Sequence, residues 1–339
     1  MADGHGISRR GLLGATGLAG VGVLAAACGG GGGDGKNGGS PGGGWAFTDD
    51  RKRRVSLSAR PKRVVAYIGT AAALADYGIG DRIVGVFGPT KKKNGQADPM
   101  AGNVDIDKVA SLGNTFGEFN VEKYAELRPD VLVTHIFQKN VLWYVPEKSA
   151  DKIAKVAPSI GITVAGVPLS HPLDRYAALA AALGADLHAG RNAAAKKRFD
   201  NAVKALRDAA KANPKIKVMA ASASPDTLYI SDPKQYPDLT YYRGLGLDLV
   251  QPKPDSQGFF ESLSWENADK YGADLILLDS RTQALQPGQL KDKPTWQRLP
   301  AVKADQVVPW LSEPRYSYAG FAPHIEALAT AVKSARKVR

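Results

Sequence analysis

Cysteine is nearly absent, because the chain of 339 residues contains only Cys28. A disulfide bond needs a second cysteine, so the sequence excludes one within the chain. A zinc site built from several cysteine thiolates is excluded for the same reason. A lone cysteine is often a buried apolar residue, but the glycine-rich tract at 29–44 cannot bury a side chain. The position of Cys28 therefore needs another explanation.

Long, strongly apolar runs are also lacking. The uncharged segment 11–27 is rich in glycine and alanine, and it is shorter than the roughly 20 apolar residues of a transmembrane helix. Arg9 and Arg10 precede it, which completes the pattern of a secretory signal peptide. The arginine pair is similar to a twin-arginine export signal, with ordinary Sec export as the alternative. We therefore predict a signal peptide over residues 1–27.

The end of this segment offers an explanation for the cysteine. The stretch LAAAC at 24–28 resembles the lipobox of bacterial lipoproteins, in which the cysteine carries the lipid. The resemblance implies that Cys28 is a lipid anchor and that the protein lies at the outer face of the cytoplasmic membrane. Ala25 stands where leucine is usual, so cleavage after small residues without a lipid is the alternative. Residues 28–44 would then be the lipidated cysteine and a flexible tether.

The net charge of +12 raises the question of an acidic partner. The basic residues are scattered, and no stripe alternates basic with aromatic side chains, so we expect no nucleic-acid partner. A mild attraction to an acidic ligand or envelope polymer is compatible with this charge. The hydrophobic fraction of 44% and charged fraction of 23% are those of an ordinary globular protein.

Catalytic motifs are incomplete. Gly244-Leu-Gly246 lacks the third glycine of a dinucleotide-binding fingerprint. The segment 149–152 matches Ser-x-x-Lys, but the Ser-Asp-Asn and Lys-Thr-Gly partners of that pattern are missing, and no Gly-x-Ser-x-Gly elbow occurs. We therefore expect that the protein is not an enzyme and binds no cofactor. A membrane-anchored envelope enzyme is the alternative from a different functional class.

Histidine is also scarce, with five residues. His5 lies in the predicted signal peptide, and His188 and His324 lie in helical context. His135 and His171 each follow a predicted strand, so they are the two histidines that a metal site would use. Two histidines without a histidine-rich loop argue against a metal site. Binding of a free metal ion is kept as an alternative function.

Two parts of the chain alternate short apolar strands with helices. In the first part the strands are at 63–69, 82–87, 131–134 and 160–167, with helices at 71–77 and 121–127. In the second part the strands are at 216–221, 228–231, 275–279 and 306–310. This alternation predicts βαβ units around parallel sheets, and hence two α/β lobes.

One long helix separates the two parts. Over 192–213, Phe199, Val203, Leu206 and Ala210 fall on one face at spacings of four, three and four. At 1.5 Å per residue such a helix spans roughly 30 Å, so it can bridge two lobes. We therefore predict a first lobe at 45–172, a helical bridge at 173–213 and a second lobe at 214–339.

The second part also echoes the first. Residues 120–135 align without gaps on residues 264–279, so that Glu122 matches Glu266 and Asp130 matches Asp274. The echo favours duplication of one α/β lobe. Two such lobes create a crevice where the carboxyl ends of their strands face each other, and ligands bind there. The simplest function for an exported, tethered protein of this kind is to bind a solute.

Short motifs, taken in order, resemble one family. They are FTDD at 47–50, VSL at 55–57, PKRVV at 61–65, LRPD at 127–130 and WQRLPAVKADQVV at 296–308. Together they resemble the periplasmic-binding-protein family that serves ABC importers of ferric siderophores and cobalamin. The resemblance implies an α/β fold of two doubly wound, Rossmann-like lobes bridged by one long α-helix. It also implies a monomer that captures a ferric siderophore and delivers it to an ABC permease and its ATPase, with cobalamin or haem as alternative ligands.

Candidate ligand-binding residues follow the predicted strands. Arginine forks and tyrosine hydroxyls suit an oxygen-rich iron chelate, and aromatic rings suit its bulk. The candidates are Tyr67, Thr70, His135, Phe137, Trp143, Arg281, Trp310, Arg315, Tyr316 and Tyr318. The resemblance further implies that Glu122 and Glu266 pair with permease arginines. Simple acids at helix starts, favoured by the helix dipole, are the alternative for both.

Overall fold

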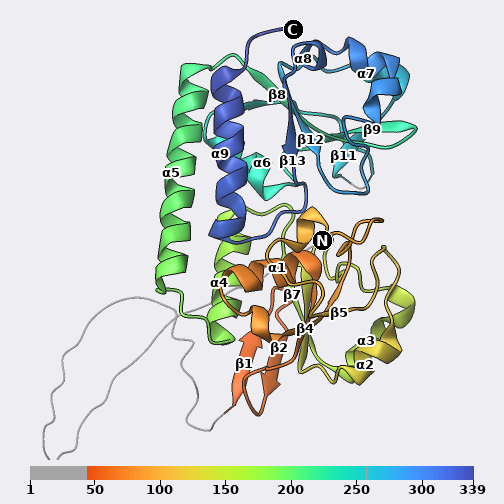
Figure 1. Cartoon of the computed structure of the whole chain (residues 1–339), viewed down its shortest axis with the longest axis vertical. Helices are drawn as coiled ribbons and strands as arrows, with labels where there is room; N and C mark the ends of the chain where they lie inside the picture. The colour runs from red at the N-terminus through yellow and green to blue at the C-terminus, as the bar shows by residue number, and fades with distance from the viewer. Residues whose placement is uncertain (1–43, 257) are drawn as a thin grey trace, which may run out of the picture. The chain divides into compact units, whose positions relative to one another are not determined.

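Two β-sheets with flanking helices organise the part of the chain that the computed structural model describes, residues 44–256 and 258–339 (Figure 1). The predicted signal peptide, Cys28 and nearly all of the tether lie outside the described residues. Within those residues, no helix combines the length and the apolar character needed to cross a membrane.

The first lobe contains a five-stranded sheet in the order β5-β4-β3-β6-β7, and all its pairings are parallel. Its strands are β3 (Val64–Tyr67), β4 (Ile83–Phe87), β5 (Ala110–Ser111), β6 (Val131–Ile136) and β7 (Ser159–Thr163). Its helices are α1 (Ile68–Asp76), α2 (Val121–Glu126), α3 (Ala150–Val156) and α4 (Ser170–Ala182). An antiparallel hairpin, β1 (Trp45–Thr48) and β2 (Arg54–Leu57), precedes the sheet.

One strand of this lobe is shorter than the sequence predicts. The apolar run at 160–167 forms a strand only over Ser159–Thr163. Gly166 adopts a φ of 65°, in the left-handed region that ends an extended segment. The chain then turns into α4, which starts at Ser170.

The second lobe contains a six-stranded sheet in the order β11-β9-β8-β12-β13, with β10 paired to β8. Its strands are β8 (Lys217–Ala223), β9 (Thr227–Ser231), β10 (Asp248–Leu249), β11 (Phe260–Ser264), β12 (Leu275–Asp279) and β13 (Val307–Trp310). Its helices are α6 (Pro237–Gly244), α7 (Pro294–Arg298) and α8 (Pro300–Lys303). Single 3₁₀ turns occur at Gly80–Arg82, Pro99–Ala101, Glu147–Ser149, Trp265–Asn267 and Leu290–Asp292.

This second sheet is mixed rather than wholly parallel. β8, β12 and β13 pair in parallel as predicted, but β9 and β11 are antiparallel. Only a short turn connects β8 to β9, and a connection that short can join only antiparallel strands.

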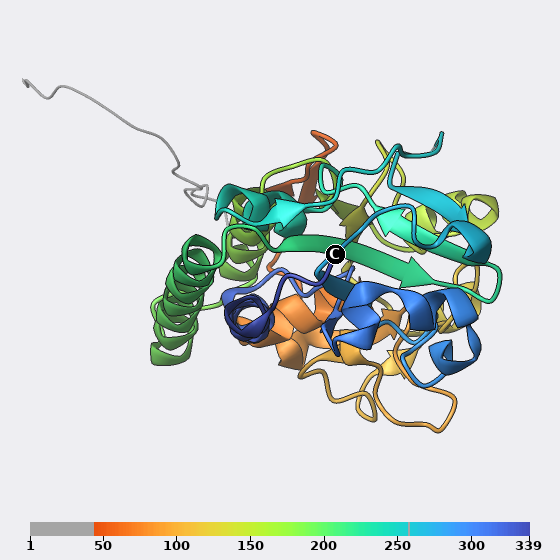
Figure 2. The ribbon, with the colours of Figure 1, turned by 90° about the horizontal axis from the view of Figure 1, so that it is seen from above.

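The long helix α5 (Gly190–Ala212) connects the two lobes, which confirms the predicted bridge helix. Phe199, Val203, Leu206 and Ala210 are all buried, as their spacing predicts. They face α9 (Tyr318–Ser334), which contains His324, a residue that the sequence places in helical context. His188, which the sequence also places in helical context, lies instead in a turn just before α5. Figures 1 and 2 both show α5 and α9 side by side, and many residues of the two helices are in contact.

The sequence repeat corresponds to a shared structural element. The Asp130 carboxylate accepts hydrogen bonds from the backbone N–H groups of Lys62 and Arg63, just before β3, at 2.7 and 2.9 Å. The Asp274 carboxylate likewise accepts a 2.9 Å bond from the N–H of Lys217, the first residue of β8. Each aspartate thus joins the start of its own strand, β6 or β12, to the start of the neighbouring strand.

Candidate functional site

Hydrogen-bond donors from both lobes converge on one carboxylate, that of Glu313. The Tyr67 hydroxyl, at the end of β3, lies 2.5 Å from Glu313 Oε2. The Trp143 indole N–H donates to the same oxygen at 2.9 Å. Arg281 donates from Nη1 to the other oxygen, Oε1. We call Tyr67, Trp143, Arg281 and Glu313, together with Asp279, the interlobe cluster.

The arginine of the interlobe cluster is held firmly. Arg281 Nε and Nη2 donate to Asp279 Oδ2 at 2.9 and 2.7 Å, and Asp279 is fully buried. Burial alone would lower the pKa of Arg281, but the carboxylates of Glu313 and Asp279 raise that pKa well above its ordinary value. Charge-assisted bonds of this kind are short and directional. Arg281 is therefore permanently charged and fixed in orientation.

Residues after β12 make further contacts with the first lobe. Thr282 Oγ1 donates to Asp98 Oδ2 at 2.5 Å. The Gln283 side-chain amide donates to the Tyr144 hydroxyl at 3.3 Å. Burial and the nearby Glu313 carboxylate raise the pKa of Tyr144 to about 12. The carboxyl ends of the two sheets therefore face each other, as the sequence predicts.

Aromatic side chains surround the interlobe cluster on the first lobe. The Phe137 and Trp143 ring centroids lie 4.8 Å apart. Phe116 packs at 5.3 Å from Trp143 and at 5.2 Å from Tyr144, yet 64% of its surface is exposed. Across the junction, Phe137 lies 6.5 Å from Phe259 of the second lobe. These rings offer apolar surface beside the charged groups.

His135 lies behind these groups and is fully buried. Its ring contacts those of Tyr67, Phe137, Tyr176 and Tyr316 at centroid distances of 5.0 to 5.8 Å. Within the described residues neither ring nitrogen has a hydrogen-bond partner, and burial lowers the pKa of His135 to about 3. The imidazole is therefore neutral and occupies an aromatic core.

The second histidine considered for a metal lies elsewhere in the fold. His171 Nε2 lies 2.8 Å from the carboxylate of Asp50, which also binds Arg175. Across residues 44–256 and 258–339, no three His, Cys, Asp or Glu side chains form a group that could hold a metal ion.

The remaining predicted residues take other positions. Thr70 is buried and shares a 2.8 Å hydrogen bond with the Tyr176 hydroxyl. The buried Trp310 donates to Asp238 at 2.7 Å, and Arg315 pairs with Asp76 at 3.2 Å. Tyr316 is buried against His135, and Tyr318 starts α9 beside α5. The interlobe cluster thus brings together Tyr67, Trp143 and Arg281, while Phe137 lies against Trp143. A ligand role for the others stays a prediction.

Sequence reasoning missed Glu313 as a site residue. It lies inside the stretch WLSEPRYSYAGF at 310–321, of which only aromatic and basic residues were predicted to bind the ligand. A lone acidic residue between a serine and a proline, three residues after a predicted strand ends, is a weak signal. Its role depends on donors that lie far away along the chain.

A model of the periplasmic binding protein family matches residues 64–314. A search of curated proteins found no match.

Several solved structures resemble this chain. DesE, a ferric-siderophore receptor protein from Streptomyces coelicolor, is 48% identical, with a TM-score of 0.84 over 87% of this chain and 100% of DesE. The petrobactin-binding protein YclQ from Bacillus subtilis is 16% identical, with a TM-score of 0.64 over 86% of this chain and 99% of its own. The triscatecholate siderophore binding protein FeuA from Bacillus subtilis is 19% identical, with a TM-score of 0.61 over 85% and 97%. The last two similarities concern the fold alone.

Proposed function

The chain belongs to the periplasmic binding protein family, and we propose that it captures a ferric siderophore between its two lobes for an ABC importer. The observation that carries this proposal is the convergence of Tyr67, Trp143 and Arg281 on a single acceptor, Glu313. The similarity to a ferric-siderophore receptor over the whole of that receptor supports it. No chemistry on the ligand is required.

Binding would exchange one acceptor for another. The oxygen atoms of an iron chelate can accept the hydrogen bonds that Tyr67, Trp143 and Arg281 now donate to Glu313. Phe116 and Phe137 would then cover the apolar parts of the chelate. Because the donors come from both lobes, a chelate held by all three would also hold the lobes together.

The local charge suggests the class of chelate. Three carboxylates, those of Asp98, Asp279 and Glu313, lie on or beside the interlobe cluster, and Arg281 is the guanidinium that pairs with two of them. A trianionic complex would be repelled at short range in these partly desolvated surroundings. A neutral or cationic complex, such as a ferric trihydroxamate, would not be repelled by these carboxylates. The proposed ligand is therefore a ferric siderophore with little or no negative charge, despite the basic balance of the whole chain.

Tryptophan fluorescence provides the test, because Trp143 lies in the interlobe cluster. We expect saturable quenching by a ferric trihydroxamate and much weaker responses to a ferric triscatecholate, ferric citrate, haem and cobalamin. Trp143→Phe should remove most of the quenching. Trp265→Phe is the matched control, since that indole bonds to the carbonyl of Pro225 outside the cluster. No response to any of these ligands, together with tight binding of zinc, would contradict the proposal.

Delivery would take place at a membrane permease with its ATPase. Glu122, in the first turn of α2, and Glu266, in the 3₁₀ turn Trp265–Asn267, are both exposed. The backbone N–H of Glu266 and the Ser264 side chain lower the pKa of the Glu266 carboxyl, which favours its charged form. We propose that these equivalent glutamates, one on each lobe, contact basic residues of a two-fold permease.

Membrane attachment completes the proposal. A lipid on Cys28 would hold the binding protein at the outer face of the cytoplasmic membrane, with the glycine-rich tract as a tether. Cys28→Ala should release the protein from membranes and leave ligand affinity unchanged. A variant that still fractionates with membranes would contradict the anchor.

A further inference from the structure

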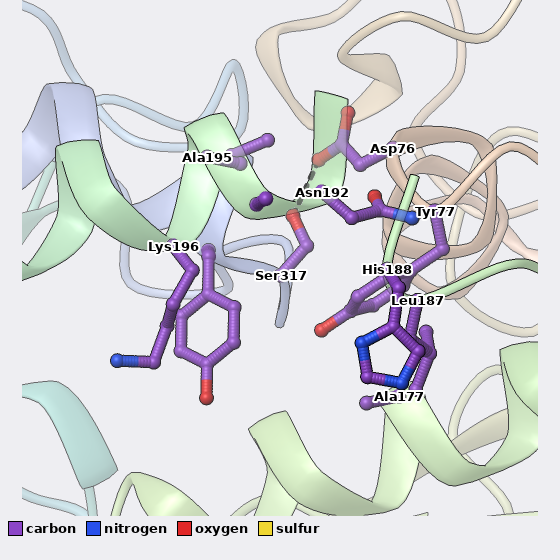
Figure 3. A pocket seen from close by; sticks show the side chains of 12 residues that line it. Asp76, Tyr77, Ala177, Leu187, His188, Asn192, Ala195, Lys196 and Ser317 are labelled. Atoms are coloured by element: carbon purple, nitrogen blue, oxygen red, sulfur yellow. Dashed lines mark hydrogen bonds between the residues drawn. The ribbon is translucent and has the colours of Figure 1, made fainter. Parts of the chain in front are cut away.

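A pocket lies away from the interlobe cluster, where α1 ends and where α5 and α9 begin (Figure 3). Its volume is about 310 Å³. α4 and the segment that leads to α5 complete its wall with Ala177, Leu187 and His188. We call it the hinge pocket, because its walls belong to the first lobe, to the bridge helix α5 and to the helix packed along it.

Small side chains create this space. Four of the lining residues are alanines, Ala177 of α4, Ala193 and Ala195 of α5, and Ala319 of α9. Each presents a single methyl group where larger side chains would fill the gap between the helices. The rings of Tyr77 and Tyr318 add aromatic surface. The interior therefore suits an apolar, ring-containing molecule.

One buried polar group in the wall has no partner. Tyr77 is 4% exposed, and within the described residues its hydroxyl makes no hydrogen bond. Figure 3 shows its phenol ring beside His188, with the hydroxyl directed toward the interior of the pocket. Buried hydroxyls nearly always have a partner. The Tyr77 hydroxyl oxygen is closed off from water in this structure, so a small rotation of the side chain toward the pocket would let it donate to an acceptor atom of a ligand. Burial, with Tyr318 and Asp76 nearby, raises the pKa of Tyr77, which keeps the phenol protonated as a donor.

The charged groups of the wall are already paired. The Asp76 carboxylate accepts from Ser317 at 2.5 Å and from Asn103 at 3.0 Å, and it pairs with Arg315. Lys196 binds Asp200 at 2.6 Å. A deeply placed anion would meet the Asp76 carboxylate beside Tyr77, and a cation would find no free carboxylate among these groups. An uncharged ligand meets neither obstacle.

We infer that the hinge pocket is a second small-molecule site, which takes an uncharged aromatic compound bearing a carbonyl or ether oxygen. The ring lies among the alanine methyl groups and the two tyrosine rings, and the oxygen accepts the Tyr77 hydrogen bond. This site is independent of the iron chelate proposed for the interlobe cluster, so it can be tested on the protein without that ligand.

Prodan, an uncharged naphthalene ketone, is a suitable probe, because its emission moves to shorter wavelengths in apolar surroundings. With the full chain we expect saturable binding with such a shift. Ala193→Phe should weaken binding about tenfold, since the added ring can occupy the space between the helices that Prodan would take. Ala194→Phe is the matched control, because Ala194 is the next residue of α5 and is exposed but does not line the pocket. It should bind Prodan as the unaltered chain does.

Tyr77→Phe tests the hydrogen bond while it keeps the ring. We expect about fivefold weaker Prodan binding, the effect of one lost hydrogen bond. The anionic naphthalene 1-anilinonaphthalene-8-sulfonate should bind the pocket more weakly than Prodan. Circular dichroism would confirm that each variant is folded. The inference is overturned if Prodan fails to saturate, if Ala193→Phe binds it unchanged, or if a saturating ferric trihydroxamate displaces it completely.

Discussion

The interlobe cluster and the hinge pocket lie at opposite ends of one helix, α1, and differ in charge and in hydrogen bonding. Tyr67 precedes the first turn of α1, and its hydroxyl has a charged acceptor, Glu313. Tyr77 follows the last turn, and its hydroxyl has no partner within the described residues. The same residue type therefore serves two chemistries. In the interlobe cluster the buried charged groups pair with one another. In the hinge pocket, which alanines line, the neutral Tyr77 hydroxyl has no partner within the described residues.

The largest effect should come from breaking the charge pairing of the interlobe cluster. Arg281→Ala would leave Asp279 and Glu313 buried without their guanidinium. We expect a loss of about 4 kcal/mol in the free energy of unfolding at pH 7, as for other broken buried ion pairs. Urea denaturation measures it. The exposed Arg243 provides the matched control, and Arg243→Ala should change stability by less than about 0.5 kcal/mol.

The next effect should come from the neutral histidine behind the cluster. The pKa of His135 is lowered to about 3 by burial, so the folded state binds fewer protons than the unfolded state below the ordinary pKa near 6.5. Its contribution to stability is complete above pH 6.5 and falls as the pH drops toward 3. His135→Phe should remove about 3 kcal/mol of the stability lost between pH 7 and pH 4.

Urea denaturation across this pH range would measure the difference between His135→Phe and the unaltered chain. His188→Gln is the matched control, because His188 is exposed at the rim of the hinge pocket. Identical pH profiles for His135→Phe and the unaltered chain would show that folding does not lower the pKa of His135.

A smaller effect should come from changing the charge of Glu313 while keeping its shape. Glu313→Gln removes one of the carboxylates that repel an anionic chelate. Binding of a ferric triscatecholate should improve about tenfold, while binding of a ferric trihydroxamate should change much less. Fluorescence titration measures both, with Glu126→Gln on the exposed face of α2 as the control. Equal changes for both ligands would mean that charge does not select the chelate.

The smallest effect on binding should come from residues outside both regions. Reversing Glu122 and Glu266 to lysine should leave ferric chelate and Prodan affinities unchanged, since both side chains are exposed. Uptake of the ferric chelate by cells should fall, because each glutamate contributes modestly and the two together set orientation on the permease. Normal uptake by the double variant would assign these residues a structural role alone.

Local patterns in the sequence predicted the elements well. The strand over Leu275–Asp279 and the buried face of α5 follow from apolar runs and from a helical period, both of which depend only on neighbours along the chain. The strand β9 was predicted at 228–231 but not its antiparallel direction, and β11 was not predicted at all. Strand direction depends on how the chain returns to the sheet, which no local pattern shows. The sequence placed His324 in helical context, but it did not predict that the helix around it, α9, packs along α5.

The sequence by itself determined the two α/β lobes, the helix between them and the candidate donors Tyr67, Trp143 and Arg281, since strand ends and residue types can be read locally. Only the tertiary structure decided that these donors share Glu313, which lies 246 residues beyond Tyr67. It also decided that alanines of three helices leave a pocket beside Tyr77. Contacts between distant segments depend on how whole lobes pack, and no local period of the sequence encodes that packing.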